Sequence, residues 1–345
     1  MVSDLAGGLN TEPTQDFIPA CHGWILIGDS VRNRLVERNV ISGATGSIYS
    51  FNSAPDQMTL DEANELVYFT VHPESKRLYK LDLGTGLISW NFIEQTLFGD
   101  ASSHTYSWAL EDIAIGDSGN IFAIMIDPIL QDPGDNIPFT STGKWLGLMD
   151  ADANFLSPSL PLEVPTLVEY DPVLNHVFLA TASNLATFDF DTNTNQISFV
   201  QGTDIPVGSG CTDFSISPDG TRLAYSCPGG NGGSGEFSIW DMAADNYHNI
   251  DGEWYLEDSP VSAVFNNEGT ILLASDNTKL YLFDVVTHLL LEDYELGLEE
   301  GETVNKIRFS KDGELIILYL NNKIHIDGSR FMYMPMPPIT ATPLP

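Results

Sequence analysis

The chain has 345 residues, of which 43% are hydrophobic, and its 48 acidic against 14 basic side chains give a formal net charge of −34. This charge repels nucleic-acid phosphates and anionic membrane surfaces, so we expect no nucleic-acid partner. No apolar stretch reaches the roughly 18 residues of a membrane span, so we expect no direct membrane insertion. The acidic balance favours solubility and leaves the binding of cations open.

Short apolar runs separated by tight polar turns recur along the whole chain. Hairpin turns such as Pro218-Asp219-Gly220 and Asn267-Glu268-Gly269 each precede an apolar strand, and their closing glycine tolerates the left-handed backbone of a short turn. An acidic residue follows a large apolar one at the end of most third strands, as in Phe188-Asp189 and Phe283-Asp284. We expect this carboxylate to accept the backbone N–H two residues later and to hold the next turn.

The spacing of these marks, about 40 to 50 residues, is typical of propeller blades. In chain order, the predicted blades span residues 16–52, 56–98, 108–160, 165–201, 210–256, 260–297 and 303–335. The predicted fold is therefore an all-β, seven-bladed β-propeller of four-stranded antiparallel blades. Residues 1–15 are a tail or a latch strand, 16–335 the propeller, and 336–345 the Pro/Thr-rich start of a linker. We expect a monomeric domain of a larger protein.

Two stretches resemble known propeller families. Trp240-Asp241 falls where WD40-like repeats carry their namesake dipeptide, and Ser217-Pro218-Asp219-Gly220 is similar to the hairpin of YVTN-like surface propellers. No Gly-His pair opens the predicted blades, so the Asp/His network of true WD40 repeats is not expected. The resemblance implies the fold, together with binding functions more often than catalysis.

The long predicted loops lie on one face of the expected disc. They are residues 100–108 before blade 3, an insertion at 127–143, a Gly-rich loop at 228–235, and 252–258 before blade 6. Long loops on a rigid scaffold usually carry binding residues. The candidates for contact with a protein or glycan partner are His104, Tyr106, Trp108, Trp254 and Tyr255. Alternatively, Trp108 and Trp254 pack between blades as core residues.

Polar residues also recur near the starts of the predicted innermost strands. Those with oxygen ligands suited to Ca²⁺ are Glu111, Asp112, Glu169, Asp213 and Asn305. This placement resembles lactonase-type propellers, which implies a Ca²⁺-dependent hydrolase as the alternative function. A water-filled acidic funnel without metal is the other interpretation of the same residues.

Cys211 and Cys227 flank one hairpin turn at similar distances, so they form either a cross-strand disulfide or two buried free thiols. A disulfide fits an oxidising compartment. No Gly-x-Ser-x-Gly or His-Glu-x-x-His motif is present, so the sequence offers no nucleophilic or zinc-protease centre. Together these features predict a non-enzymatic binding module of a prokaryotic periplasmic, cell-surface or secreted protein.

Overall fold

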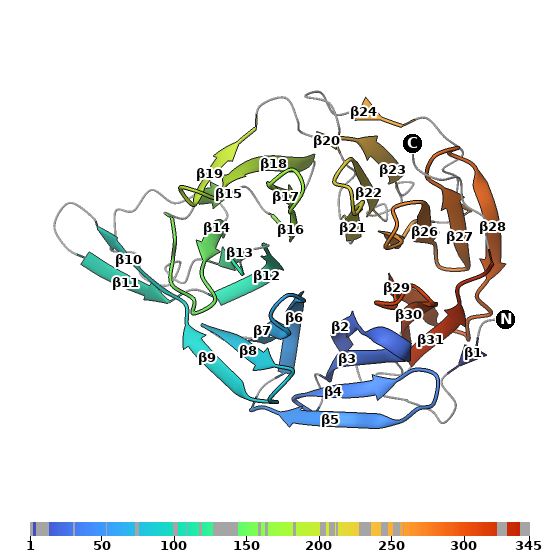
Figure 1. Ribbon diagram of the computed structural model, residues 1–345, viewed down its shortest axis with the longest axis horizontal. Helices are drawn as coiled ribbons and strands as arrows, with labels where there is room; N and C mark the ends of the chain where they lie inside the picture. Colours follow the sequence, from blue (N-terminus) through green and yellow to red (C-terminus); the bar gives the residue numbers. More distant parts are fainter. Residues whose placement is uncertain are drawn as a thin grey trace. The chain divides into compact units, whose positions relative to one another are not determined.

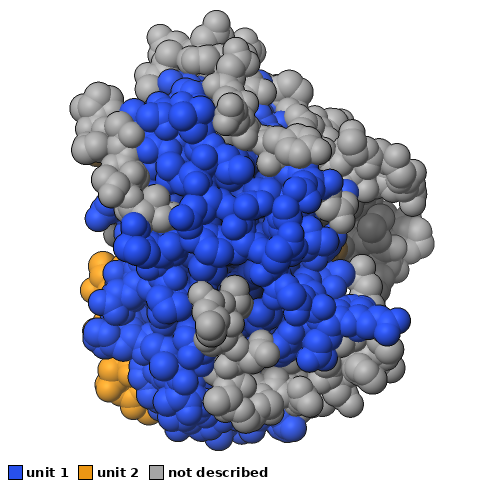
Figure 2. Space-filling model, turned by 90° about the vertical axis from the view of Figure 1, so that its right-hand side faces the viewer, with its two compact units in different colours: residues 1–50, 205–345 blue, residues 51–204 orange. Residues whose placement is uncertain are grey.

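The computed structural model confirms the predicted fold class, an all-β seven-bladed propeller. It describes residues 3–4, 14–29, 32–52, 54–72, 76–98, 103–107, 109–116, 119–126, 144–157, 160–162, 165–181, 184–200, 205–206, 211, 213–227, 236–242, 248–250, 256–257, 259–322 and 330–338. The chain divides into unit 1, residues 1–50 with 205–345, and unit 2, residues 51–204 (Figure 2). Each unit is considered by itself below.

Unit 1 contains blades 1, 5, 6 and 7, each a four-stranded antiparallel sheet in its described residues (Figure 1). Blade 1 consists of β2 (Thr14–Pro19), β3 (Trp24–Asp29), β4 (Arg34–Asn39) and β5 (Thr45–Ser50), with the 3-10 turn η1 (Cys21–Gly23) before β3. Blade 5 consists of β21 (Asp213–Ile216), β22 (Arg222–Cys227), β23 (Glu236–Asp241) and β24 (His248–Asn249). Blade 6 consists of β25 (Ser262–Phe265), β26 (Ile271–Ser275), β27 (Lys279–Asp284) and β28 (Leu290–Glu295).

Blade 7 combines the two ends of the chain. Its strands are β29 (Glu302–Phe309), β30 (Leu315–Asn322), β31 (Arg330–Pro335) and the N-terminal β1 (Ser3–Asp4). β1 pairs antiparallel with β31, with Ser3 opposite Tyr333 and Asp4 opposite Met332. The short strand β20 (Ile205–Pro206) also belongs to the residue range of unit 1.

Unit 2 contains blades 2, 3 and 4 and a separate hairpin. Blade 2 consists of β6 (Ala54–Asp61), β7 (Leu66–His72), β8 (Arg77–Asp82) and β9 (Ile88–Phe92). Blade 3 consists of β12 (Ala109–Ile115), β13 (Ile121–Ile126), β14 (Lys144–Met149) and β15 (Leu160–Leu162). Blade 4 contains β16 (Leu167–Asp171), β17 (His176–Ala180), β18 (Asn184–Asp191) and β19 (Gln196–Phe199).

The hairpin of β10 (Glu94–Phe98) and β11 (Ser103–Ser107) corrects two expectations. Blade 2 ends at Phe92 rather than at residue 98, and residues 103–107 form a strand rather than part of an irregular loop. Both segments contain Thr and an aromatic residue, which favour extended backbone, and they pair with each other. The predicted loop segments at 127–143, 228–235 and 252–255 lie outside the described residues.

The blades within a unit are joined through buried apolar faces. In unit 1, Phe17 and Ile25 of blade 1 pack with Tyr319 and Phe331 of blade 7. Further clusters join blade 5 to 6 and blade 6 to 7 in unit 1, and blade 2 to 3 and blade 3 to 4 in unit 2. Since both faces of a blade are covered, second strands consist mainly of apolar residues, and β26 is buried at all five positions.

The turns behave largely as the sequence predicts. Gly220, Gly269 and Gly313 have φ values of 70°, 69° and 72°, which a residue with a Cβ adopts only at a cost. The carboxylate of Asp284 accepts the N–H of Val286 at 2.9 Å, as expected.

In blade 4 the expected position of the turn is wrong by two residues. β18 continues to Asp191, and the carboxylate of Asp191 accepts the N–H of Asn193 at 2.9 Å. Asp189 instead pairs with His176 at 2.9 Å.

Candidate functional site

The five predicted contact residues are only partly covered by the described structure. His104 and Tyr106 lie on β11, opposite Leu97 and Gln95 of β10. Trp108, Trp254 and Tyr255 lie outside the described residues. The contact role of all five therefore stays a prediction.

Three of the predicted metal residues lie on innermost strands of unit 2. Glu111 of β12 forms an ion pair with Lys144 of β14 at 2.5 Å. An oxygen of Asp112 accepts the backbone N–H of Val168 at 2.8 Å, which links blade 3 to blade 4. Glu169 is exposed on β16. Donors of the protein itself thus hold the carboxylates of Glu111 and Asp112.

The other two predicted metal residues lie in unit 1. Asn305 is exposed at an irregularity of β29, where the register shifts between Val304 and Lys306. Asp213 of β21 is 5% exposed and meets Arg308 of β29 in a two-pronged ion pair. The two terminal nitrogens of Arg308 donate to the two carboxylate oxygens at 2.9 and 3.1 Å.

The ion pair continues into blade 6. The hydroxyl of Ser262, fully buried on β25, donates to the carboxylate of Asp213 and accepts the backbone N–H of Ile307 at 3.1 Å. This arrangement ties the innermost strands of blades 5, 6 and 7 together by charge-assisted hydrogen bonds. A Ca²⁺ ion bound to Asp213 would first have to displace Arg308, so the channel metal stays a prediction and gains no support from this residue.

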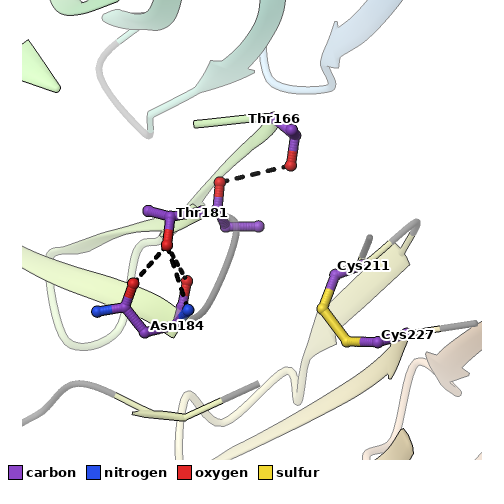
Figure 3. The surroundings of a disulfide bond; sticks show 6 residues. Thr166, Thr181, Asn184, Cys211 and Cys227 are labelled. Atoms are coloured by element: carbon purple, nitrogen blue, oxygen red, sulfur yellow. Dashed lines mark hydrogen bonds between the residues drawn. A yellow bond between two sulfur atoms is a disulfide. The ribbon is translucent and has the colours of Figure 1, made fainter. Parts of the chain in front are cut away.

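The structure contains the disulfide between Cys211 and Cys227, shown in Figure 3. Both cysteines are buried, and Cys227 is the last residue of β22. Cys211 immediately precedes the segment that carries Asp213. The bridge therefore ties the residue two positions before Asp213 to the end of β22.

Two exposed aromatic residues lie together on β9, the edge strand of blade 2. Trp90 and Phe92 are 43% and 48% exposed, and their ring centroids lie 5.2 Å apart with the rings edge to face. The guanidinium carbon of Arg77 on β8 lies 3.9 Å from the Trp90 ring centroid and 4.9 Å from that of Phe92. We call Arg77, Trp90 and Phe92 the β9 aromatic cluster.

Strand pairing explains how these three side chains meet. Residues two apart on a strand share a face, so Trp90 and Phe92 project from the same side of β9. The register places Arg77 opposite Phe92 and Tyr79 opposite Trp90. Tyr79 stacks on Phe69, which is fully buried, with ring centroids 5.2 Å apart. The exposed cluster therefore stands at the end of an aromatic row that begins in the core.

The chemistry of the cluster is that of a recognition surface. Arg77 rests on two ring faces, so its guanidinium is held by cation–π attraction that is strongest with Trp. Trp and Arg are also the residues most enriched where protein interfaces gain their binding free energy. This site was not among those predicted from the sequence, although the alternation Trp90-Asn91-Phe92 on a last strand is a visible signal. The position of Arg77 beside the two rings can be known only from the register of β8 with β9.

No protein-family model matches this chain, and no curated protein was found to be similar to it. In the described part of the chain, no helix has the length and apolar character needed to cross a membrane.

Proposed function

We propose that the protein is a non-enzymatic binding module that captures a protein partner. The observation that carries this proposal is the β9 aromatic cluster, in which Trp90 and Phe92 remain nearly half exposed in a folded domain. Covering these two rings would remove apolar surface from water, which contributes about 25 cal/mol per Å². β9 is also the edge of its sheet, so its outward backbone groups can pair with an extended segment of a partner.

A protein fits the cluster better than a glycan does. A sugar stacks on one ring and needs several polar groups around it to bind its hydroxyls. The cluster instead offers two aromatic rings and one guanidinium, which is the composition of a protein–protein hot spot. The predicted contact residues His104, Tyr106, Trp108, Trp254 and Tyr255 would add further contacts with a partner of the same module.

We further propose an extracytoplasmic location in a prokaryotic surface or secreted protein, and kinship with the WD40-like and YVTN-like propellers. The disulfide between Cys211 and Cys227 supports the location, since such bonds persist mainly in oxidising compartments. Trp240-Asp241 at the end of β23 and the turn Pro218-Asp219-Gly220 before β22 support the kinship, because they resemble the repeat motifs of these families.

A display experiment tests the proposed function. A random 15-residue peptide library is selected on the wild-type protein, and each enriched peptide is measured against the double variant Trp90→Ser, Phe92→Ser. We expect the affinity for these peptides to fall at least tenfold, about 1.4 kcal/mol, because the hot-spot rings are lost.

The matched control is Phe199→Ser. Phe199 is 49% exposed at the end of β19, also an outer strand of unit 2, and packs against Phe188. The control should leave peptide affinity unchanged. Equal affinity of the double variant and wild type would contradict the proposal, and binding to a printed glycan array that depends on Trp90 would assign the cluster to a glycan instead.

A further inference from the structure

Two turns from the first and last blades of unit 1 bring together three potential metal ligands. His22 lies in η1 before β3, whereas Asp312 and Glu314 lie in and after the turn between β29 and β30. One ligand atom from each of these three side chains falls within 4.8 Å of the others, and the described residues contain no other group of this kind. Residues of β3 and β30 belong to one buried apolar cluster that joins blade 1 to blade 7.

The spacing of the ligand atoms suits direct coordination. Nδ1 of His22 lies 3.4 Å from Oδ2 of Asp312. Two ligands at zinc distances of about 2.1 Å and a tetrahedral angle are separated by about 3.4 Å, so both atoms can bind one ion without a change of backbone. The side chain of His22 is 82% exposed and that of Asp312 is 16% exposed, which leaves the outer positions of the ion open to water.

The backbone that carries the ligands is fixed independently of any ion. Ser310 donates its hydroxyl to Oδ1 of Asp312 at 2.5 Å, and the N–H of His22 donates to Oδ2 at 2.6 Å. The side chain of Asn267, from a blade 6 turn, donates to the carbonyl of Lys311 at 2.8 Å. Of these groups, the hydroxyl of Ser310 lies outside the ligand set and orients the carboxylate of Asp312, and such a second partner is a regular feature of metal sites.

We propose that His22, Asp312 and Glu314 bind a divalent transition-metal ion of the Zn²⁺ class. One imidazole nitrogen and two carboxylates form the mixed set that Zn²⁺ accepts, whereas Ca²⁺ prefers oxygen ligands alone. The ion would connect His22 to Asp312, which are separated by 290 positions in the chain, and would thereby cross-link blade 1 and blade 7. The net charge of −34 raises the concentration of cations near the surface and assists binding. This site is separate from the β9 aromatic cluster and does not depend on the proposed function.

Calorimetric titration of the metal-free full chain with ZnCl₂ tests the proposal. We expect one Zn²⁺ per chain with a micromolar dissociation constant, and at least tenfold weaker binding in His22→Asn and in Glu314→Gln. Asn tolerates the left-handed backbone at this position, where φ is 56°. Circular dichroism and the unfolding midpoint without metal verify that each variant is folded.

The matched control is His288→Asn. His288 also lies in a tight turn of unit 1 with φ of 61°, but outside the ligand group. Saturating Zn²⁺ should raise the melting temperature of wild type and His288→Asn but not that of His22→Asn. Absence of Zn²⁺ binding to wild type, or equal affinity of wild type and His22→Asn, would overturn the proposal. Tighter binding of Ca²⁺ than of Zn²⁺ would also overturn it.

Discussion

Replacing Asp213 by Ala would measure how strongly the innermost strands of blades 5, 6 and 7 depend on one ion pair. The change leaves the guanidinium of Arg308 and the hydroxyl of Ser262 without their shared acceptor. Removing one partner of a fully buried pair costs about 3–5 kcal/mol. The side chain of Arg308 is 23% exposed and can regain some water, so we expect about 2–3 kcal/mol.

Urea unfolding at pH 7, followed by tryptophan fluorescence, would give this loss as a lower midpoint at unchanged slope. The double variant Asp213→Ala, Arg308→Met contains no unpaired charge, so it should be more stable than Asp213→Ala alone. A loss below about 0.5 kcal/mol in the single variant, or losses that simply add in the double variant, would refute the reasoning.

Two other substitutions test blade 7. Burial acts to raise the pKa of Glu302, but the hydrogen bonds from Arg330 and from the backbone N–H of Glu299, together with the positive charge of Arg330, hold the pKa below the ordinary 4.5. The ionised form of Glu302 therefore stabilises the fold, so the urea midpoint of wild type should exceed that of Glu302→Gln at pH 7. The difference between the two midpoints should shrink as the pH falls below about 4.5, because Glu302 then becomes protonated. A difference independent of pH would contradict this. Phe331→Ala should cost about 3–5 kcal/mol of unfolding free energy by urea titration, since Phe331 is 1% exposed and meets the ring of Phe17, whereas Phe199→Ala on the surface should cost much less.

The fold was predictable because local signals agreed with one another along the chain. The continuous apolar runs of β13 and β26 are buried on both faces, and Asp-Gly or Glu-Gly pairs close the turns before β22, β26 and β30. The failure in blade 4 has a clear cause. Phe188-Asp189-Phe190-Asp191 presents the same apolar–acidic pair twice, two residues apart, so either pair could end the strand. The pairing of Phe190 and Asp191 with Ile197 and Gln196 of β19 decides between them.

The functional site was less predictable because it depends on pairing between strands. Trp90 and Phe92 are visible in the sequence, but their exposure and the position of Arg77 follow from the register of β8 with β9. Oxygen ligands near strand starts were equally visible. Whether these oxygens are available to a cation could not be predicted, because Arg308, which pairs with Asp213, lies 95 positions further along the chain.

Two kinds of contact hold the N-terminal part of unit 1 against blade 7: strand pairing and apolar packing. Their relative strength explains the loss of unfolding free energy expected for Phe331→Ala. Among the described residues, β1 and β31 pair over two positions, and each hydrogen bond contributes a net stabilisation of about 0.5–1.5 kcal/mol. Phe331, by contrast, contacts Phe17 of blade 1 and Tyr319, with ring centroids 5.2 Å apart in both cases. Burying one such side chain contributes about 1.5–3 kcal/mol, and its removal also leaves a cavity. Apolar packing between blades 1 and 7, more than the pairing of β1, therefore joins the beginning of the chain to its last blade, and a loss for Phe331→Ala no larger than that of Phe199→Ala would contradict this.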